Sequence, residues 1–201
     1  MKLKKIASLM LAGIIAVSML AGCKSATEPT EEPEVTPVTG VAATVNSVLT
    51  SKKDKINLSE NEVVTGLMKS YFTENPLTDG EWTKADTSSV NDTSWFTDLN
   101  KSIDAVLGAE SDNFSKISNN HHENKTYTEL YVLNTSYVSM DNALRMVGQK
   151  IDDVNMPSEA KNKDYDYSYT GTISAIEAES EGGTESVWVI AVSITQTSTK
   201  K

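Results

Sequence analysis

The stretch YDYSYTGTISAIEAESEGGTESVWVIAVSIT, residues 165–195, decides the fold. Its first half places a tyrosine at every second position of YDYSY, which is the period of two that is typical of a β-strand. Its second half is a continuous apolar run around Trp188, typical of a strand that is buried on both faces. Gly182 and Gly183 lie between the halves and suit a tight turn. We therefore predict a hairpin of two long antiparallel strands, with residues 187–194 as a central strand of the sheet.

Apolar residues recur at helical spacing in three segments that precede this hairpin. Residues 60–73 carry a broad apolar face, and Ser59 with Glu62 fits a Ser-x-x-Glu capping box at its start. Gly108 suits the end of a second helix, and Ser139 suits the start of a third. The predicted helices span about 60–73, 94–108 and 140–152, and a shorter amphipathic stretch lies at 41–49.

The segment before the third helix has two interpretations. A heptad-like spacing of apolar residues favours one long helix over about 127–152. The same segment begins with TYTELYV, which is dense in Thr, Tyr and Val and favours a strand. Because Ser139 resembles an N-cap, we prefer a strand over 127–133 followed by a separate helix. Helices first and a hairpin last predict an α+β domain, with three or more helices followed by a C-terminal antiparallel β-hairpin in a small sheet.

The N-terminus has the pattern of an export signal. Three lysines precede an apolar run from Ile6 to Ala21, which is shorter than a comfortable membrane span. The run ends in Leu-Ala-Gly-Cys, and this motif resembles the lipobox of bacterial lipoproteins. The resemblance implies that residues 1–22 are a signal peptide and that Cys23 becomes the lipid-modified N-terminus. An ordinary secretory signal with an incidental cysteine is the alternative.

Beyond Cys23 the chain changes character. Residues 23–40 hold three of the five prolines together with Thr and Glu, so we predict a disordered tether that leads to one globular domain over residues 41–201. The chain has no cysteine besides Cys23, so with Cys23 lipid-modified we expect the exported domain to have no intramolecular disulfide, no cysteine zinc site and no thiol nucleophile. The expected location is the cell membrane, lipid-anchored and facing outside the cytoplasm.

The charge and the motifs exclude several classes of partner. The formal net charge of −10 disfavours nucleic acid and anionic lipid surfaces, which would repel the chain. Arg145 is the single arginine, and bidentate phosphate or carboxylate clamps prefer arginine. The chain has no glycine-rich phosphate loop, no Gly-x-Ser-x-Gly elbow and no His-Glu-x-x-His motif. No cofactor is therefore predicted.

A helix that begins at Ser139 and is followed by YTGTISAIEAESEGGTESVWVIAVSIT resembles the last third of the CAP/SCP family. The resemblance implies an α-β-α sandwich and a metal-binding tetrad of two His and two Glu. Phe114-Ser115-Lys116 stands where the family has an aromatic-Ser-His triplet, and Glu129-Leu130-Tyr131-Val132 stands where it has Gly-Glu-Asn-Ile. One family histidine and one asparagine are absent, so a CAP-like fold would lack the tetrad.

Metal ligation has little support from the residue pattern. His121 and His122 are the only histidines, and adjacent residues point in different directions, so we interpret them as part of a polar loop. Asp164 and Asp166 start like a Ca²⁺ loop, but the pattern lacks the glycine and the final glutamate that such a loop needs. A looser Ca²⁺ site that adds two more acids, Asp152 and Asp153, remains an alternative.

Aromatic residues are the remaining candidates for ligand binding. Tyr165, Tyr167 and Tyr169 share one face of the first hairpin strand, where they either pack in the core or form a surface for sugars or peptides. Trp82 lies in the polar stretch TDGEWTKAD, and an exposed loop tryptophan is a hint of recognition.

Taken together, these features favour a lipid-anchored extracytoplasmic interaction or ligand-binding domain rather than an enzyme. The expected partners are the membrane, through the anchor, and a cell-wall glycan, a peptide or a protein. Two alternatives remain: an envelope hydrolase that uses acidic residues, and a CAP-like domain with a degenerate metal tetrad. Carboxylates that converge in a cleft would favour the hydrolase.

Overall fold

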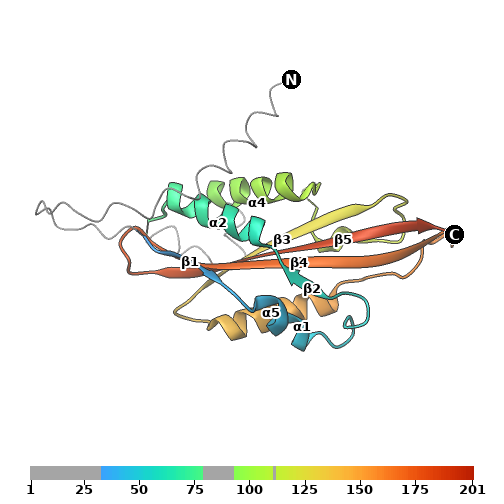
Figure 1. Ribbon diagram of the computed structural model, residues 1–201, viewed down its shortest axis with the longest axis horizontal. Helices are drawn as coiled ribbons and strands as arrows, with labels where there is room; N and C mark the ends of the chain where they lie inside the picture. The colour runs from blue at the N-terminus through green and yellow to red at the C-terminus, as the bar shows by residue number, and fades with distance from the viewer. Residues whose placement is uncertain (1–32, 79–92, 111) are drawn as a thin grey trace, which may run out of the picture. The chain divides into compact units, whose positions relative to one another are not determined.

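The structure is a computed structural model that describes residues 33–78, 93–110 and 112–201, all of which belong to one compact unit. This part of the chain is an α+β domain with four α-helices and five strands (Figure 1). The elements, in chain order, are β1 (Val35–Val38), α1 (Val41–Val48), β2 (Leu58–Glu60), α2 (Glu62–Glu74), α4 (Ser94–Leu107), the 3₁₀ turn η3 (Phe114–Lys116), β3 (Lys125–Asn134), α5 (Met140–Asp153), β4 (Tyr165–Glu179) and β5 (Ser186–Lys200). Among these residues no helix is both long and apolar enough to cross a membrane.

The C-terminal hairpin is confirmed and forms the centre of the sheet. β4 and β5 pair antiparallel from Tyr165 opposite Lys200 to Glu179 opposite Ser186. Gly183 has a φ of +65°, a conformation that glycine adopts without strain, and it closes the turn between the strands. The order across the sheet is β1-β4-β5-β3. The short strand β2 also pairs directly with β4, in parallel, at Gly171–Ile173, whereas β1 pairs with β4 at Ala175–Ala178. β5 therefore lies between two long strands, as the apolar run around Trp188 predicted.

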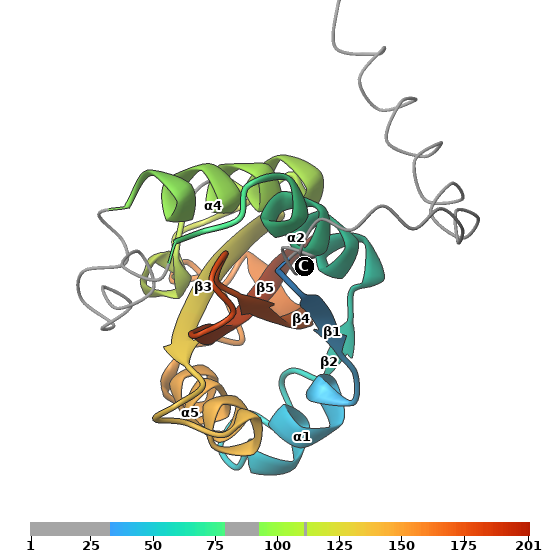
Figure 2. The ribbon, with the colours of Figure 1, turned by 90° about the vertical axis from the view of Figure 1, so that its left-hand side faces the viewer.

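Helices cover both faces of the sheet (Figure 2). α1 and α5 pack on one face over a core that includes Ile173, Ile190 and Ile194. α2 and α4 pack on the other face over a second core that includes Ile176 and Val189. Because side chains alternate between the faces of a strand, the continuous apolar run of β5 supplies both cores.

The strand interpretation of the segment before α5 is confirmed. β3 pairs antiparallel with β5, with Tyr127 opposite Ile194 and Leu133 opposite Trp188. Tyr127 and Leu133 face the α1–α5 core, whereas Val132 faces the α2–α4 core. A single long helix would have placed these apolar residues along one face of the helix. In the sheet they point alternately to its two faces and contribute to both cores.

The helices predicted at 94–108, after Ser139 and at 41–49 are confirmed, with Gly108 at the left-handed C-cap of α4 and Ser139 at the N-cap of α5. The capping box predicted for α2 is wrong. Asn61 is the N-cap, and its side-chain oxygen accepts hydrogen bonds from the N–H groups of Val63 and Val64, both at 3.1 Å. Ser59 lies in β2 instead, where it pairs with β4, and asparagine caps a helix as well as serine does.

The N-terminal boundary also differs from the prediction. Residues 23–40 were expected to be tether, but Val35–Val38 form β1 and pair with Ala175–Ala178 of β4. Val35 is buried in the α2–α4 core, so apolar burial and main-chain pairing together outweigh the effect of the flanking prolines. The folded domain therefore begins before residue 41.

A carboxylate fixes the C-terminal end of α5. Asp152 accepts hydrogen bonds at 2.8–3.0 Å from the main-chain N–H groups of Thr50, Ser51 and Lys52, and at 2.7 Å from the Thr50 hydroxyl. The Thr50 hydroxyl and these N–H groups lower the pKa of Asp152 from its ordinary value to about 2. The last turn of α5 is thereby held on the loop between α1 and β2.

We expect Gly171→Ala to destabilise the fold. A Cβ atom at this position would lie 2.4 Å from Leu58 Cδ2 and 2.8 Å from Ile56 Cδ1, so the buried side chains of Leu58 and Ile56 would have to shift. Overpacking of this kind costs about 1–3 kcal/mol in the free energy of unfolding, which a urea titration would measure. Gly66→Ala on α2 is the control, because nothing lies within 4 Å and alanine favours a helix by about 0.5–1 kcal/mol. Equal effects of the two changes would contradict the packing described for Gly171.

We expect Asp152→Asn to lower the melting temperature at pH 7. The pKa of Asp152 is lower in the folded chain than in the unfolded chain, so the stabilisation is complete above about pH 4 and is lost as the pH falls towards 2. Melting curves of both proteins between pH 7 and pH 2 would show the difference and its disappearance. Asp153→Asn is the neighbouring control, and a pH-independent difference would contradict this role of the Asp152 charge.

Candidate functional site

The tyrosine stripe at the start of β4 packs into the core. Tyr167 and Tyr169 are buried, and Tyr165 is half-buried. The Tyr167 hydroxyl donates to the main-chain oxygen of His121 at 2.5 Å, and the Tyr169 hydroxyl donates to that of Pro157 at 2.7 Å. These rings tie two loops to the sheet, so the open aromatic face that would dock a sugar or a peptide is not formed here.

A buried amide completes the polar interior beside these rings. Gln196 on β5 accepts a hydrogen bond from the Tyr127 hydroxyl at 3.3 Å, and its amide nitrogen donates to the Ser118 oxygen at 2.9 Å and to the Tyr169 hydroxyl at 3.3 Å. Burial, with a smaller effect of the neighbouring tyrosines, raises the pKa of Tyr169. The network satisfies its own donors and acceptors, so its role is structural.

Two other candidates, Cys23 and Trp82, lie outside the described residues. His121 and His122 lie in the loop between η3 and β3, as predicted. The His122 ring packs on Tyr165, with ring centroids 4.8 Å apart and an angle of 35° between the planes.

The looser Ca²⁺ site that the sequence left as an alternative is not formed by the four aspartates in the described chain. The Asp152 carboxylate accepts hydrogen bonds from main-chain N–H groups of the α1–β2 loop, and Asp166 forms an ion pair with Lys201 at 3.0 Å. In the part of the chain that the structure describes, no group of three or more His, Cys, Asp or Glu side chains is placed to hold a metal ion. The four acids therefore do not converge.

A hollow of about 290 Å³ is the candidate site. It lies where η3, β3 and the C-terminal end of α5 meet, and it is open to solvent. Its lining combines apolar side chains with one amine, two carboxylates, a hydroxyl and an amide. These residues are Phe114, Ser115, Ile117, Glu129, Lys150, Asp153, Val154 and Asn155.

Glu129 of β3 is held in a fixed orientation at this hollow. Its Oε1 accepts a hydrogen bond at 3.1 Å from the main-chain N–H of Phe114, and its Oε2 accepts one from the Tyr131 hydroxyl. Burial, and then the adjacent Glu129, raise the pKa of Tyr131 far above its usual range, so this hydroxyl stays a donor. A carboxylate offers about four acceptor positions, so Glu129 keeps capacity for a ligand.

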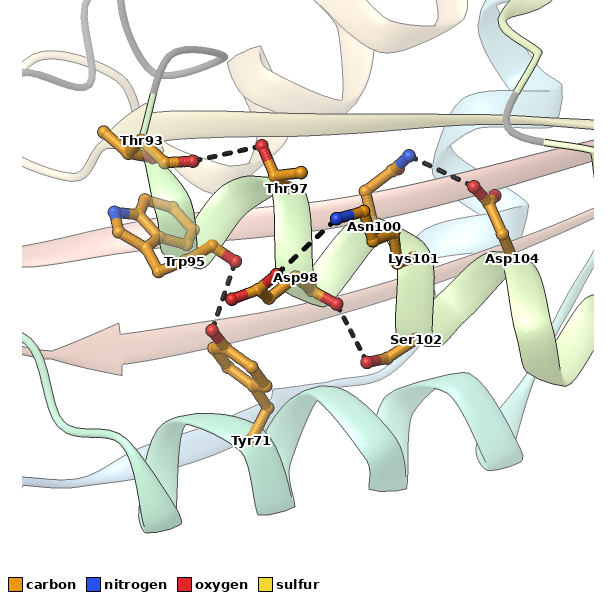
Figure 3. A network of polar contacts seen from close by, with 9 residues as sticks. All are labelled: Tyr71, Thr93, Trp95, Thr97, Asp98, Asn100, Lys101, Ser102 and Asp104. Carbon is orange, nitrogen blue, oxygen red and sulfur yellow. Dashed lines mark hydrogen bonds and ion pairs between the residues drawn. The ribbon is translucent and has the colours of Figure 1, made fainter. Parts of the chain in front are cut away.

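The opposite face of β3 is fastened to α4 by a buried carboxylate. Asp104 is 3% exposed, and it accepts hydrogen bonds from the hydroxyl of Thr128 and from the side-chain amide of Asn100, the latter at 3.3 Å (Figure 3). Nearby, the Tyr71 hydroxyl of α2 donates to the main-chain oxygen of Trp95 at 3.2 Å and joins the two helices. The adjacent residues Thr128 and Glu129 thus fix β3 from both of its faces.

This arrangement suits binding by polar contacts more directly than catalysis. Glu129 and Asp153 supply acceptors, Lys150 in the last turn of α5 supplies a mobile cation, and Phe114 supplies an apolar wall. Lys150 and Asp153 are exposed, so their charges are solvated until a ligand covers them. The hydrogen bonds that both oxygens of Glu129 accept within the fold hold the carboxylate in place, and its remaining acceptor positions can receive a donor from a bound group.

Sequence reasoning identified only part of this hollow. The CAP/SCP resemblance pointed to Phe114-Ser115-Lys116 and to Glu129, and the structure does bring Phe114, Ser115 and Glu129 together. Lys150 and Asn155 were missed, because nothing in a single sequence tells which surface side chains of a helix end will face a particular turn. Asp104 was also missed, and only its place beside the apolar residue Ile103 could have indicated burial.

Three comparisons with known proteins found no relative. No protein-family model matches the chain, no curated protein matches it, and no solved structure matches it. The comparisons therefore name no family for this chain, and the CAP/SCP resemblance stays a prediction.

Proposed function

We propose that this chain is a lipid-anchored binding domain of the bacterial cell envelope that holds a polar ligand in the hollow between η3, β3 and α5. The observation that carries the proposal is the fixed Glu129 carboxylate at the wall of an open hollow. Side chains that are already oriented lose little conformational freedom when a ligand binds, so they favour affinity. The proposed anchor is Cys23, on the basis of the Leu-Ala-Gly-Cys motif.

The charge of the hollow indicates the class of ligand. Glu129 and Asp153 outnumber Lys150, so a ligand with an ammonium group and hydroxyl or amide groups would find a partner for each. Cell-wall peptides and amino sugars carry such groups. A strongly anionic ligand would meet two carboxylates and only one mobile cation.

A hydrolase that uses acidic residues is the second candidate function. Glu129 and Asp153 line the same hollow, and paired carboxylates serve as acid and base in glycoside cleavage. Two features favour binding instead: Glu129 accepts two hydrogen bonds within the fold, and Asp153 is exposed. Turnover of a bound saccharide would favour the second candidate.

We expect Cys23→Ser to abolish lipid attachment. Without the thiol no acyl chains can be added, so the full chain expressed in a bacterium would leave the washed membrane fraction, because the acyl chains supply the affinity for the bilayer. Mass spectrometry of the N-terminal peptide would show acyl chains on the unaltered protein only. Ser25→Ala is the matched control. Identical membrane retention and identical N-terminal masses for the cysteine variant would contradict the anchor.

We expect a ligand of the hollow to raise the melting temperature of the detergent-solubilised full chain. Muropeptides, oligosaccharides, Ca²⁺ and Zn²⁺ are the probes, and a ligand at 100 times its dissociation constant adds about 2.7 kcal/mol, or roughly 5–10 °C. Glu129→Gln and Asp153→Asn should each weaken binding by about tenfold.

Glu62→Gln is the control for this experiment, because it changes an exposed carboxylate on α2, across the sheet from the hollow. If Glu62→Gln lowered the affinity of a ligand as much as Glu129→Gln and Asp153→Asn do, the hollow would not be the binding site of that ligand. The same samples, analysed by mass spectrometry after incubation, would reveal cleavage of a probe and so test the hydrolase.

A further inference from the structure

The C-terminal hairpin extends past α1 and α5 at the end of the sheet where β4 turns into β5 (Figure 1). A row of side chains crosses three strands there: Thr36 of β1 is opposite Glu177 of β4, and Glu177 is opposite Trp188 of β5. Trp188 packs against the α1–α5 core, so the row lies on that face of the sheet. The next row inwards, at Ala175 and Ile190, is fully buried, whereas none of the three outer residues is. The helices therefore leave this end of the face open to solvent.

Carboxylates gather at this open end without a counter-charge. Glu179 follows Glu177 by two residues and so shares its face. The N–H of Glu179 donates to the main-chain oxygen of Glu34 at 3.0 Å, and the Thr36 hydroxyl donates to Glu34 Oε1 at 3.0 Å, which places the third carboxylate beside the other two. None of the ion pairs in the described chain involves these three glutamates. Like charges that face each other across strands are destabilising, so a cation bound here would offset a cost that the fold leaves in place.

An oriented indole ring lies beside these carboxylates. The Trp188 Nε1–H group donates to the main-chain oxygen of Val138 at 2.7 Å, and the Ser186 hydroxyl donates to Glu177 Oε1 at 3.0 Å. Ring and carboxylate are thus held next to each other before any ligand arrives. Tryptophan is the side chain whose ring face attracts cations most strongly, and a carboxylate adds a full opposite charge. We call this surface the acidic shelf, and its residues are Glu34, Thr36, Glu177, Glu179 and Trp188.

The geometry of the acidic shelf suits an organic cation better than a metal ion. A metal ion needs several ligand oxygens that converge at 2.0–2.6 Å in general, and no three acidic side chains of the described chain are placed in this way. An ammonium group that carries methylene or methyl groups is larger. It can contact a ring face on one side and accept the attraction of separate carboxylates on the other.

The course of the chain brings the acidic shelf close to the proposed lipid anchor. β1 begins at Val35, which pairs with Ala178 near the hairpin turn. Eleven residues, Lys24–Glu34, connect Cys23 to this strand, and even fully extended they span at most about 40 Å. In zwitterionic phospholipids the ammonium group is the terminal group of the headgroup, beyond the phosphate. An acidic surface that approaches from the water therefore meets the ammonium first, whereas an anionic lipid repels it.

We propose that the acidic shelf binds the ammonium group of a zwitterionic phospholipid headgroup in the bilayer that holds the anchor. Trp188 supplies the ring face, Glu177 and Glu179 supply the opposite charge, and the attached lipid keeps the shelf near its ligand. The bilayer as the source of the ligand rests on the anchor proposed at Cys23, but the recognition of an ammonium group does not. This end of the sheet then faces the membrane.

NMR spectra of the full chain in a non-ionic detergent test the recognition of the ammonium group. Trp188→Phe identifies the indole N–H signal of Trp188. Titration with glycerophosphoethanolamine should shift this signal to saturation, whereas the N-acetylated compound, which has lost the positive charge, should not. Glu177→Gln combined with Glu179→Gln should weaken binding by at least about threefold, because exposed charge pairs contribute modestly. Glu62→Gln is the control, because it removes an exposed carboxylate from α2 on the other face and should leave the affinity unchanged.

Vesicles that carry the lipidated full chain test the bilayer as the source of the ligand. The difference in fluorescence between the unaltered chain and Trp188→Phe gives the emission of Trp188. Acrylamide should quench this emission about twofold less in vesicles of phosphatidylethanolamine and phosphatidylglycerol than in vesicles of phosphatidylglycerol alone, because a bound headgroup excludes water and quencher from the ring. The chain with Glu177→Gln and Glu179→Gln should be quenched equally in both kinds of vesicle.

Different results would overturn the two parts of the proposal. Equal shifts with glycerophosphoethanolamine and its N-acetyl derivative, or an affinity that the two glutamine changes leave unaltered, would overturn ammonium binding by the shelf. A saturable shift with the soluble compound but equal quenching of the unaltered chain in both kinds of vesicle would overturn the lipid as the ligand. A saturable shift in a chain whose Cys23 carries no acyl chains would also remove the bilayer as the source, and the failure would then lie in the proposed anchor and not in the ammonium site.

Discussion

The pairing of β4 with β5 is the constraint on which the rest of this domain depends. The two strands pair along fifteen residues each, and no other contact in the described chain has this extent. Their apolar side chains point to both faces, so neither face is stable in water without a cover. Four amphipathic helices supply that cover, two on each face, and the helices need the sheet equally because short isolated helices are marginal.

Within this frame β3 is the strand that joins the core to the candidate site. Thr128 is bound to α4 on one face, and Glu129 is bound to η3 on the other. Successive side chains of a strand point to opposite faces of the sheet, so two neighbouring polar residues can bind to the helices on opposite faces. The orientation of Glu129 in the hollow is therefore set by the packing of the whole sandwich.

Local patterns predicted the elements, and tertiary contacts decided what the patterns left open. The hairpin, the caps at Gly108 and Ser139 and the strand nature of β3 follow from periodicity and residue type. The position of β1 does not follow from local patterns. The prolines around Val35 indicate a tether, and only the pairing with β4 makes this segment a strand. The tyrosine stripe is similar: alternation predicts the strand, but which loops meet the hydroxyl groups of Tyr167 and Tyr169 depends on residues over ten positions away.

The register of the sheet also sets where the candidate site stands relative to the start of the described domain. Val35 pairs with Ala178, which is opposite Val187 of β5, and Glu129 pairs with Val192. Val187 and Val192 are five positions apart along β5, which is about 17 Å at the usual rise per residue. A shift of one residue between strands would turn every side chain to the other face and bury Glu129 under α4. The same apolar alternation that stabilises the core thus fixes both the face and the position of the hollow, so the site is set by the sheet rather than by the loops around it.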